Sequence, residues 1–196
     1  MANWTDVFRR FRWPPRELGL ATTANLALLA TDQRQRFART CLLAIALGLL
    51  TVLMMGTLDH FVFAGASLER IRTLARFSFA QRTGIVLFSA VTEEVVYRLI
   101  IATAIAAALQ AVLRKATSQS AMIAMWLSII AAALLFGLAH AGNLQNVPHP
   151  YLRAVTLNGV AGIVLGYLYW FRGLEAAVLA HLTADAFIYL IVANFI

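Results

Sequence analysis

Long apolar runs alternate with short polar stretches along most of this chain. Each run is long enough for a helix to cross a bilayer, which takes about 20 residues. The runs cover residues 40–63, 84–109, 121–141, 154–171 and 174–196. They lack the ten-residue alternation of membrane β-strands. The pattern therefore predicts an all-α fold, a polytopic transmembrane helical bundle with about five spans.

Two polar segments predict amphipathic helices that lie on the membrane surface. Residues 1–39 carry seven arginines, and aromatic side chains interleave with the first three up to Pro14-Pro15. Residues 65–83 combine arginines with apolar positions at helical spacing. Such helices bury an apolar face in the headgroup layer. We therefore expect a basic amphipathic segment over residues 1–39, followed by a transmembrane domain over 40–196.

Composition and charge agree with a membrane protein. The chain is 61% hydrophobic and 13% charged, whereas soluble domains are about 45–50% apolar and about 25% charged. The formal net charge of +7 comes from basic residues that flank the apolar runs. That placement favours contact with anionic lipid and disfavours nucleic acid as a partner. Cys41 is the single cysteine, which excludes an internal disulfide.

Three ionisable residues interrupt the second apolar run: Glu93, Glu94 and Arg98. Each ionised group costs about 2.5–3.5 kcal/mol at the centre of a bilayer. Glu94 and Arg98 are spaced i,i+4 and can pair, while Glu93 points about 100° away and has no local cation. A lone carboxyl that exchanges protons with water is a candidate general base. The structural alternative is that the trio only locks helices together.

Further ionisable residues lie in the third and fifth runs. His140 ends the third run, where a lone histidine is more typical of a membrane interface than of a site. His181 and Asp185 share one helix face, so Asp185 can orient the imidazole or share its proton. In antiparallel spans that rise about 1.5 Å per residue, Glu93 lies at nearly the depth of Asp185, and His181 lies about one helical turn away from that depth. The same count of residues along the third run places His140 nearer the membrane surface.

Other positions predict packing and exposure. Asp59 lies near the end of the first run, where we expect it to reach water. The fourth run contains Gly159, Gly162 and Gly166, which permit close helix packing. That packing can lie within the bundle or across a dimer, so homo-oligomerisation stays open.

Three motifs in these runs resemble those of the CAAX-protease and bacteriocin-processing family of intramembrane proteases. Residues 93–98 resemble its EExxxR motif, residues 136–140 its FxxxH motif, and residues 181–185 its HxxxN or HxxxD motif. The resemblance covers residues 80–195 and includes the type II CAAX prenyl endopeptidase. It implies an integral, multi-pass membrane endopeptidase, in a bacterial inner membrane, that acts on a membrane-associated peptide or protein substrate.

The resemblance also implies catalytic roles. Glu93 would be the general base that activates water, and His140 would bind that water or share its proton. His181 and Asp185 would polarise the scissile carbonyl and stabilise the oxyanion. The prenyl endopeptidase has Asn at the last position, whereas ionised Asp185 cannot donate a hydrogen bond. Asp185 must therefore be protonated or serve by orienting His181.

The remaining motif residues and the cofactor follow from the same resemblance. Glu94 and Arg98 would hold the site together. A metal-free reaction is favoured, although Glu93, His140 and His181 also form a ligand set known in catalytic zinc sites. The chain contains no HExxH motif that would support zinc from local spacing.

Two other function classes remain as alternatives. The chain could be a non-catalytic membrane scaffold or a bacteriocin-immunity-type protein that only binds a partner. It could also be a proton-coupled transporter, because intramembrane Glu, His and Asp form proton relays. Five spans without a visible inverted repeat disfavour the transporter.

Overall fold

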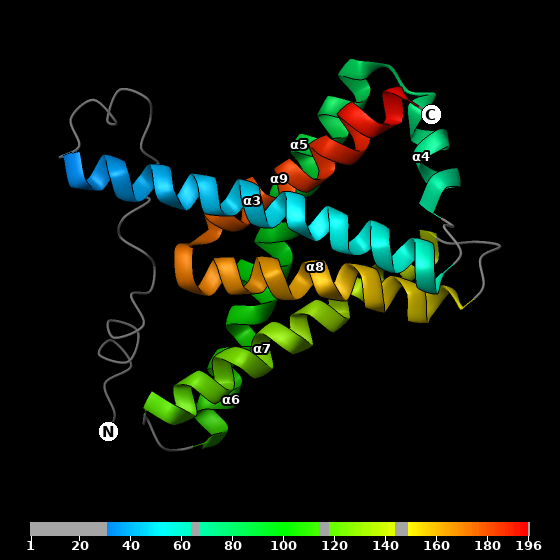
Figure 1. Ribbon diagram of the computed structural model, residues 1–196. Coiled ribbons are helices and arrows are strands. Elements are labelled where there is room, and N and C mark those ends of the chain that lie inside the picture. The colour runs from blue at the N-terminus through cyan, green and yellow to red at the C-terminus, as the bar shows by residue number, and fades with distance from the viewer. Residues whose placement is uncertain (1–30, 64–66, 114–117, 144–148, 196) are drawn as a thin grey trace.

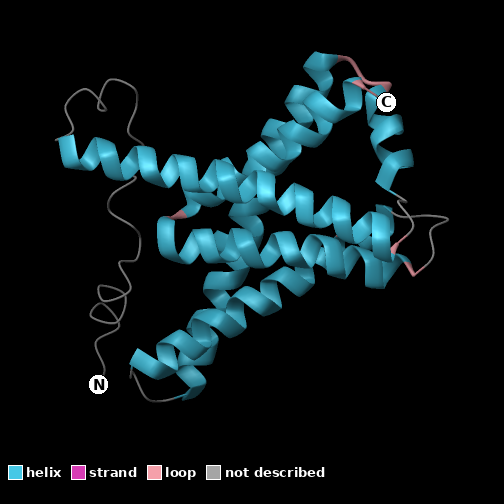
Figure 2. Cartoon of the chain, viewed as in Figure 1, coloured by secondary structure: helices cyan, strands magenta, loops and turns pink. Residues whose placement is uncertain are grey.

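The computed structural model describes residues 31–63, 67–113, 118–143 and 149–195, and within these ranges all regular structure is helical (Figure 2). Segments η2 and η4 are π-helical, and η3 and η5 are short 3-10 turns. In chain order the elements are α3 (Thr31–Val62), α4 (Ser67–Ala75), α5 (Phe79–Glu94), η2 (Val95–Ala102), α6 (Thr103–Leu113), α7 (Ser118–Ala139), η3 (Ala141–Asn143), α8 (Pro150–Arg172), α9 (Leu174–Ala186), η4 (Phe187–Ile191) and η5 (Val192–Asn194).

Five helices in the described ranges are long and apolar enough to cross a membrane. They cover Arg34–Val62, Phe79–Leu113, Gln119–Ala139, Pro150–Arg172 and Leu174–Asn194. The predicted all-α polytopic bundle is therefore confirmed. Helix α3 begins before the first apolar run, so the arginines just ahead of that run lie in the same helix as the first span. The amphipathic helix predicted at the N-terminus falls on residues 1–30, outside the described residues.

The short amphipathic helix predicted over 65–83 is present as α4 (Ser67–Ala75), but it is shorter than predicted, because the last residues of the segment belong to α5. Helix α4 ends at Ala75, and α5 starts after Ser78. The Ser78 hydroxyl accepts from the Gln81 N–H at 3.3 Å, and Gln81 Oε1 accepts from the Ser78 N–H at 2.9 Å. This capping box satisfies two backbone donors and starts a new helix. As a result, Arg82 lies at the beginning of the second span.

The long helices cross one another obliquely (Figure 1). Helix α3 packs beside α8 and α9, and α7 packs along α8. The continuous helix α5–η2–α6 crosses this group, with α5 packed on α9 and η2 and α6 packed on α7. The middle of this helix, where Glu93, Glu94 and Arg98 lie, is therefore enclosed by the other spans.

Small residues allow α7 and α8 to approach closely. A Cβ atom on Gly162 would lie 2.7 Å from Ala133 Cβ, and one on Gly166 would lie 2.9 Å from Ile129 Cγ2. Gly159 differs, because a Cβ atom there would have no neighbour within 4 Å. The predicted close packing is confirmed for Gly162 and Gly166, and it lies within the bundle.

A buried ion pair joins the end of α3 to the first turn of α8. Arg153 Nε donates to Asp59 Oδ1 at 2.7 Å, and the two residues are only 3% and 4% exposed. The expectation that Asp59 reaches water is therefore wrong. Because α8 begins beside the end of α3, its first turn covers the carboxylate and supplies the cation. Pairing is what makes a buried carboxylate tolerable.

The α7–α8 contact predicts opposite effects at two glycines of one helix. Gly162→Ala should lower the free energy of unfolding by about 1–3 kcal/mol, because the added methyl overlaps Ala133. Gly159→Ala should be neutral or slightly stabilising, because alanine favours a helix over glycine by about 1 kcal/mol. Tryptophan fluorescence during thermal unfolding in detergent measures both variants. Equal losses would contradict the packing described.

Candidate active site

A cavity of about 330 Å³ lies between helices α3, α4, α5, α7, α8 and α9. Most of its wall is apolar. Four predicted catalytic residues from three of the spans line it: Glu93, His140, His181 and Asp185. The fold thus brings together side chains that the sequence spreads over almost 100 positions.

Glu93 and Glu94 are adjacent on α5 but have opposite surroundings. The Glu93 side chain is 27% exposed and lines the cavity, whereas the Glu94 side chain is fully buried. Neighbouring residues of a helix point about 100° apart. Only Glu93 can therefore meet water or a substrate in the cavity.

Glu94 is the centre of a buried polar cluster. Its Oε1 lies 3.1 Å from Arg98 Nη1 and 2.8 Å from His181 Nδ1. The Arg98 guanidinium also lies 4.7 Å from the centre of the Phe136 ring, and its Nη2 donates to the Gly162 carbonyl at 3.5 Å. The predicted pairing of Glu94 with Arg98 is confirmed. The contact with His181 was not predicted, because it joins residues far apart in the sequence.

Both histidines turn the same ring nitrogen toward Glu93. His181 Nδ1 pairs with Glu94 Oε1 at 2.8 Å, and His140 Nδ1 donates to the Phe136 carbonyl at 2.8 Å, since a carbonyl oxygen only accepts. The Nε2 atoms of His140 and His181 then lie 3.8 and 3.9 Å from Glu93 Oε2. Such separations exceed a direct hydrogen bond but suit polar groups that share one water.

His140 reaches this cluster from the end of α7. The helix stops at Ala139, and the His140 N–H donates to the Gly137 carbonyl at 3.1 Å. Depth counted along untilted spans placed His140 nearer the surface than Glu93. The structure nevertheless brings the two side chains together, with His140 Nε2 3.8 Å from Glu93 Oε2.

Asp185 completes the group, with a partner that the sequence analysis missed. Asp185 Oδ2 lies 3.6 Å from His181 Nε2, and the Ser89 hydroxyl donates to the same oxygen at 3.0 Å. Ser89 lies four residues before Glu93, so the two share a face of α5. This spacing is the sequence feature by which Ser89 could have been found.

Two of the helices that carry site residues, α5 and α9, continue as π-helix just beyond them. Helix α5 passes into η2 after Glu94, and α9 passes into η4 at Phe187. Segments with i→i+5 hydrogen bonds are rare and often occur at functional sites. In η2 the Arg98 carbonyl accepts a bond from the Thr103 hydroxyl at 3.2 Å. The sequence of η2 (Val95–Ala102) gives no indication of this change in winding.

Comparison with known protein families matches residues 75–187 to the family described as type II CAAX prenyl endopeptidase Rce1-like. The match covers more than half of the chain. The chain belongs to this family. The Rce1-like segment contains all four predicted catalytic residues, together with Glu94 and Arg98, and leaves out α3 and all of α4 except Ala75. Comparisons with curated proteins and with solved structures give no match.

Membership makes this Rce1-like protein an intramembrane, CAAX-type endopeptidase by family and an integral, multi-pass membrane protein. The resemblance inferred from three short motifs is thereby confirmed. Which membrane the protein occupies stays a prediction, as do the roles of the single site residues.

This Rce1-like site holds a donor set that is chemically suitable for zinc, at separations wider than those between the ligands of a bound zinc ion. Glu93, His140 and His181 offer a carboxylate and two imidazoles, and each Nδ1 is held as in many zinc sites. Two ligands of tetrahedral zinc lie about 3.3–3.5 Å apart, whereas the separations here are 3.8 and 3.9 Å. In the described ranges, no three His, Cys, Asp or Glu side chains form a metal-binding group.

The Glu94 cluster predicts a large loss of stability on substitution. Glu94→Ala leaves Arg98 buried without its carboxylate and removes the acceptor of His181, which should cost about 3–5 kcal/mol. Glu175→Ala, at an exposed acidic residue of α9, should change stability by less than about 1 kcal/mol. The unfolding midpoint in detergent measures both. Similar losses would argue against a structural role for the Glu94 cluster.

Proposed function

We propose that this protein hydrolyses a peptide bond of a membrane-associated substrate with a water molecule that Glu93 activates. The observation that supports this most directly is the position of Glu93 Oε2. It faces the cavity and has an imidazole Nε2 on either side, at 3.8 and 3.9 Å. Family membership supports peptide hydrolysis as the reaction.

In the proposed reaction Glu93 acts first as a base and then as an acid. The carboxylate takes one proton from the water while the water oxygen attacks the carbonyl carbon of the scissile bond. Glu93 then gives this proton to the leaving amine, and the C–N bond breaks. The lone pair on His140 Nε2 can accept the other hydrogen of the water and hold it in place. A positioned general base of this kind contributes about 10²–10⁴-fold in rate.

We assign the oxyanion contact to His181. Its Nδ1 proton is bound by Glu94, so a second proton on Nε2 makes the ring a donor directed into the cavity. Three carboxylates surround this ring and balance the charge of the imidazolium, which strengthens its use as a fixed electrostatic group. Asp185 then serves by orienting His181, because its ionised carboxylate cannot donate to an oxyanion.

The family description gives the first substrate to test, a prenylated peptide that ends in a CAAX sequence. Much of the cavity wall is apolar, as an apolar substrate segment requires.

Glu93→Gln should abolish cleavage because the amide keeps the shape of the side chain and cannot accept a proton as a base. We expect kcat to fall at least 10²-fold, while the variant still inserts and stays monodisperse in detergent. The probe is a fluorescence-quenched farnesylated CAAX peptide in liposomes with purified protein. For other substrates, the membrane peptides of cells that produce wild type or the variant are compared by mass spectrometry.

Glu175→Gln is the matched control, because it makes the same change at an exposed site on α9, and it should cleave as wild type does. A Glu93→Gln variant with normal cleavage would contradict the assignment. If wild type yields no product in either assay, and a partner protein copurifies even when Glu93, His140 and His181 are all replaced, the non-catalytic scaffold is correct instead.

Metal removal tests the proposed metal-free reaction. Preincubation with 1,10-phenanthroline or EDTA should leave the cleavage rate unchanged, because the proposed base is a side chain. A rate that falls and is restored by added Zn²⁺ would support the zinc-dependent alternative, with Glu93, His140 and His181 as ligands. Zinc content measured by elemental analysis gives a readout independent of activity.

A further inference from the structure

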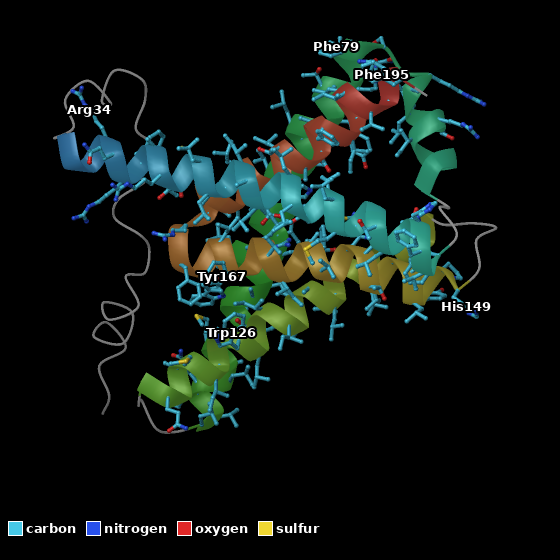
Figure 3. All side chains as sticks on the ribbon, in the orientation of Figure 1. Arg34, Phe79, Trp126, His149, Tyr167 and Phe195 are labelled. Atoms are coloured by element: carbon cyan, nitrogen blue, oxygen red, sulfur yellow. The ribbon has the colours of Figure 1, made fainter. Side chains whose placement is uncertain are left out.

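Polar contacts join α5 to the C-terminal span on both sides of the proposed catalytic residues. At the outer end, Arg82 Nη1 donates to the Tyr189 carbonyl at 2.9 Å, and Nη2 donates to Asn194 Oδ1 at 2.7 Å. Phe79 and Phe195 mark this end in Figure 3. At the inner end, Glu94 binds His181. These contacts fix the antiparallel register in which α5 and the C-terminal span face each other.

Ser89 lies between these two contacts and is not used by the proposed reaction. Its hydroxyl oxygen is 3.0 Å from Asp185 Oδ2 and 3.3 Å from the Val86 carbonyl. A hydroxyl has one proton to donate, and an ionised acceptor forms the stronger bond. The shorter contact, to Asp185, is therefore the favoured one.

The Asp185 oxygen that Ser89 holds is also the one that faces the catalytic histidine. Asp185 Oδ2 lies 3.6 Å from His181 Nε2, and Glu93 Oε2 lies 3.9 Å from the same nitrogen. Two carboxylates that approach one atom repel each other. A donor that binds one of them offsets this repulsion and keeps its oxygen directed at the ring.

We propose that Ser89 is a positioning residue, whose hydroxyl fixes the Asp185 carboxylate against His181. This inference rests on the proposed function, because it assigns Ser89 a part in the reaction that His181 assists. An asparagine at position 185 would bring its own N–H donors, whereas a carboxylate only accepts. With aspartate at this position, the fixed donor must come from a neighbouring helix, and Ser89 supplies it from α5.

The test compares Ser89→Ala and Ser89→Thr, with the farnesylated CAAX peptide or with the substrate found by mass spectrometry. Ser89→Ala should lower kcat about five- to tenfold and leave KM within about twofold, because a charge-assisted bond that orients a catalytic group is lost. Ser89→Thr keeps a hydroxyl and should restore most of kcat. Thr83→Ala is the matched control, since the Thr83 hydroxyl donates to the Phe79 carbonyl of its own helix.

A double-mutant cycle separates positioning from a general structural role. In an Asp185→Ala background, Ser89→Ala should change kcat less than about twofold, because the partner is already absent. In an Asp185→Asn background Ser89→Ala should lower kcat more than it does with Asp185→Ala and less than it does in wild type. The reason is that the hydrogen bond from Ser89 to an asparagine is neutral. The same loss in all three backgrounds would overturn the proposal, as would a Ser89→Ala variant with wild-type kcat.

The outcome is distinguishable from failure of the proposed function. If wild type cleaves and Ser89→Ala cleaves equally well, only the role of Ser89 is wrong. If wild type cleaves nothing, the proposed function is wrong. The unfolding midpoints of wild type, Ser89→Ala, Asp185→Ala and the double variant still test the contact between Ser89 and Asp185. Ser89→Ala should then lower the midpoint with Asp185 present and not with Asp185→Ala, while additive shifts would overturn the contact too.

Discussion

One buried carboxylate, that of Glu94, determines how the helices that carry the site must meet. A charge inside a bilayer is costly unless it is paired. Arg98 comes from the next turn of the same helix, whereas His181 comes from α9. The second contact requires α5 and α9 to pack in one register and turns the His181 ring. It also directs Glu93, the next residue along α5, into the cavity.

Helix packing and chemistry are linked through the same atoms. Close approach of α8 to α7 depends on Gly162, whose carbonyl accepts from Arg98 Nη2. The Arg98 guanidinium lies over the ring of Phe136, one turn before His140 on α7. A cation over an aromatic face is stabilised further when water is excluded. Residues that look purely structural in the α7–α8 contact therefore hold the cation that neutralises Glu94.

Local features were predictable from the sequence, and distant contacts were not. The apolar lengths predicted the five spans, and i,i+4 spacing predicted the pair of Glu94 and Arg98. The depth of His140 depends on helix tilt, which tertiary packing sets. The contacts of Ser89 with Asp185 and of Asp59 with Arg153 join residues 96 and 94 positions apart. Nothing in the spacing of one helix encodes such a partner on another.

The cavity that holds the site is walled in part by helices outside the Rce1-like segment. Met55 of α3 and Leu74 of α4 line it, and both lie before residue 75, where the family match begins. Neither side chain is among the polar contacts that fix Glu93 and the two histidines. Substitution at these two positions would therefore reshape the cavity and leave the polar contacts of Glu93 and the two histidines in place. The shape of the proposed substrate space and the groups of the proposed reaction thus depend on different parts of the chain.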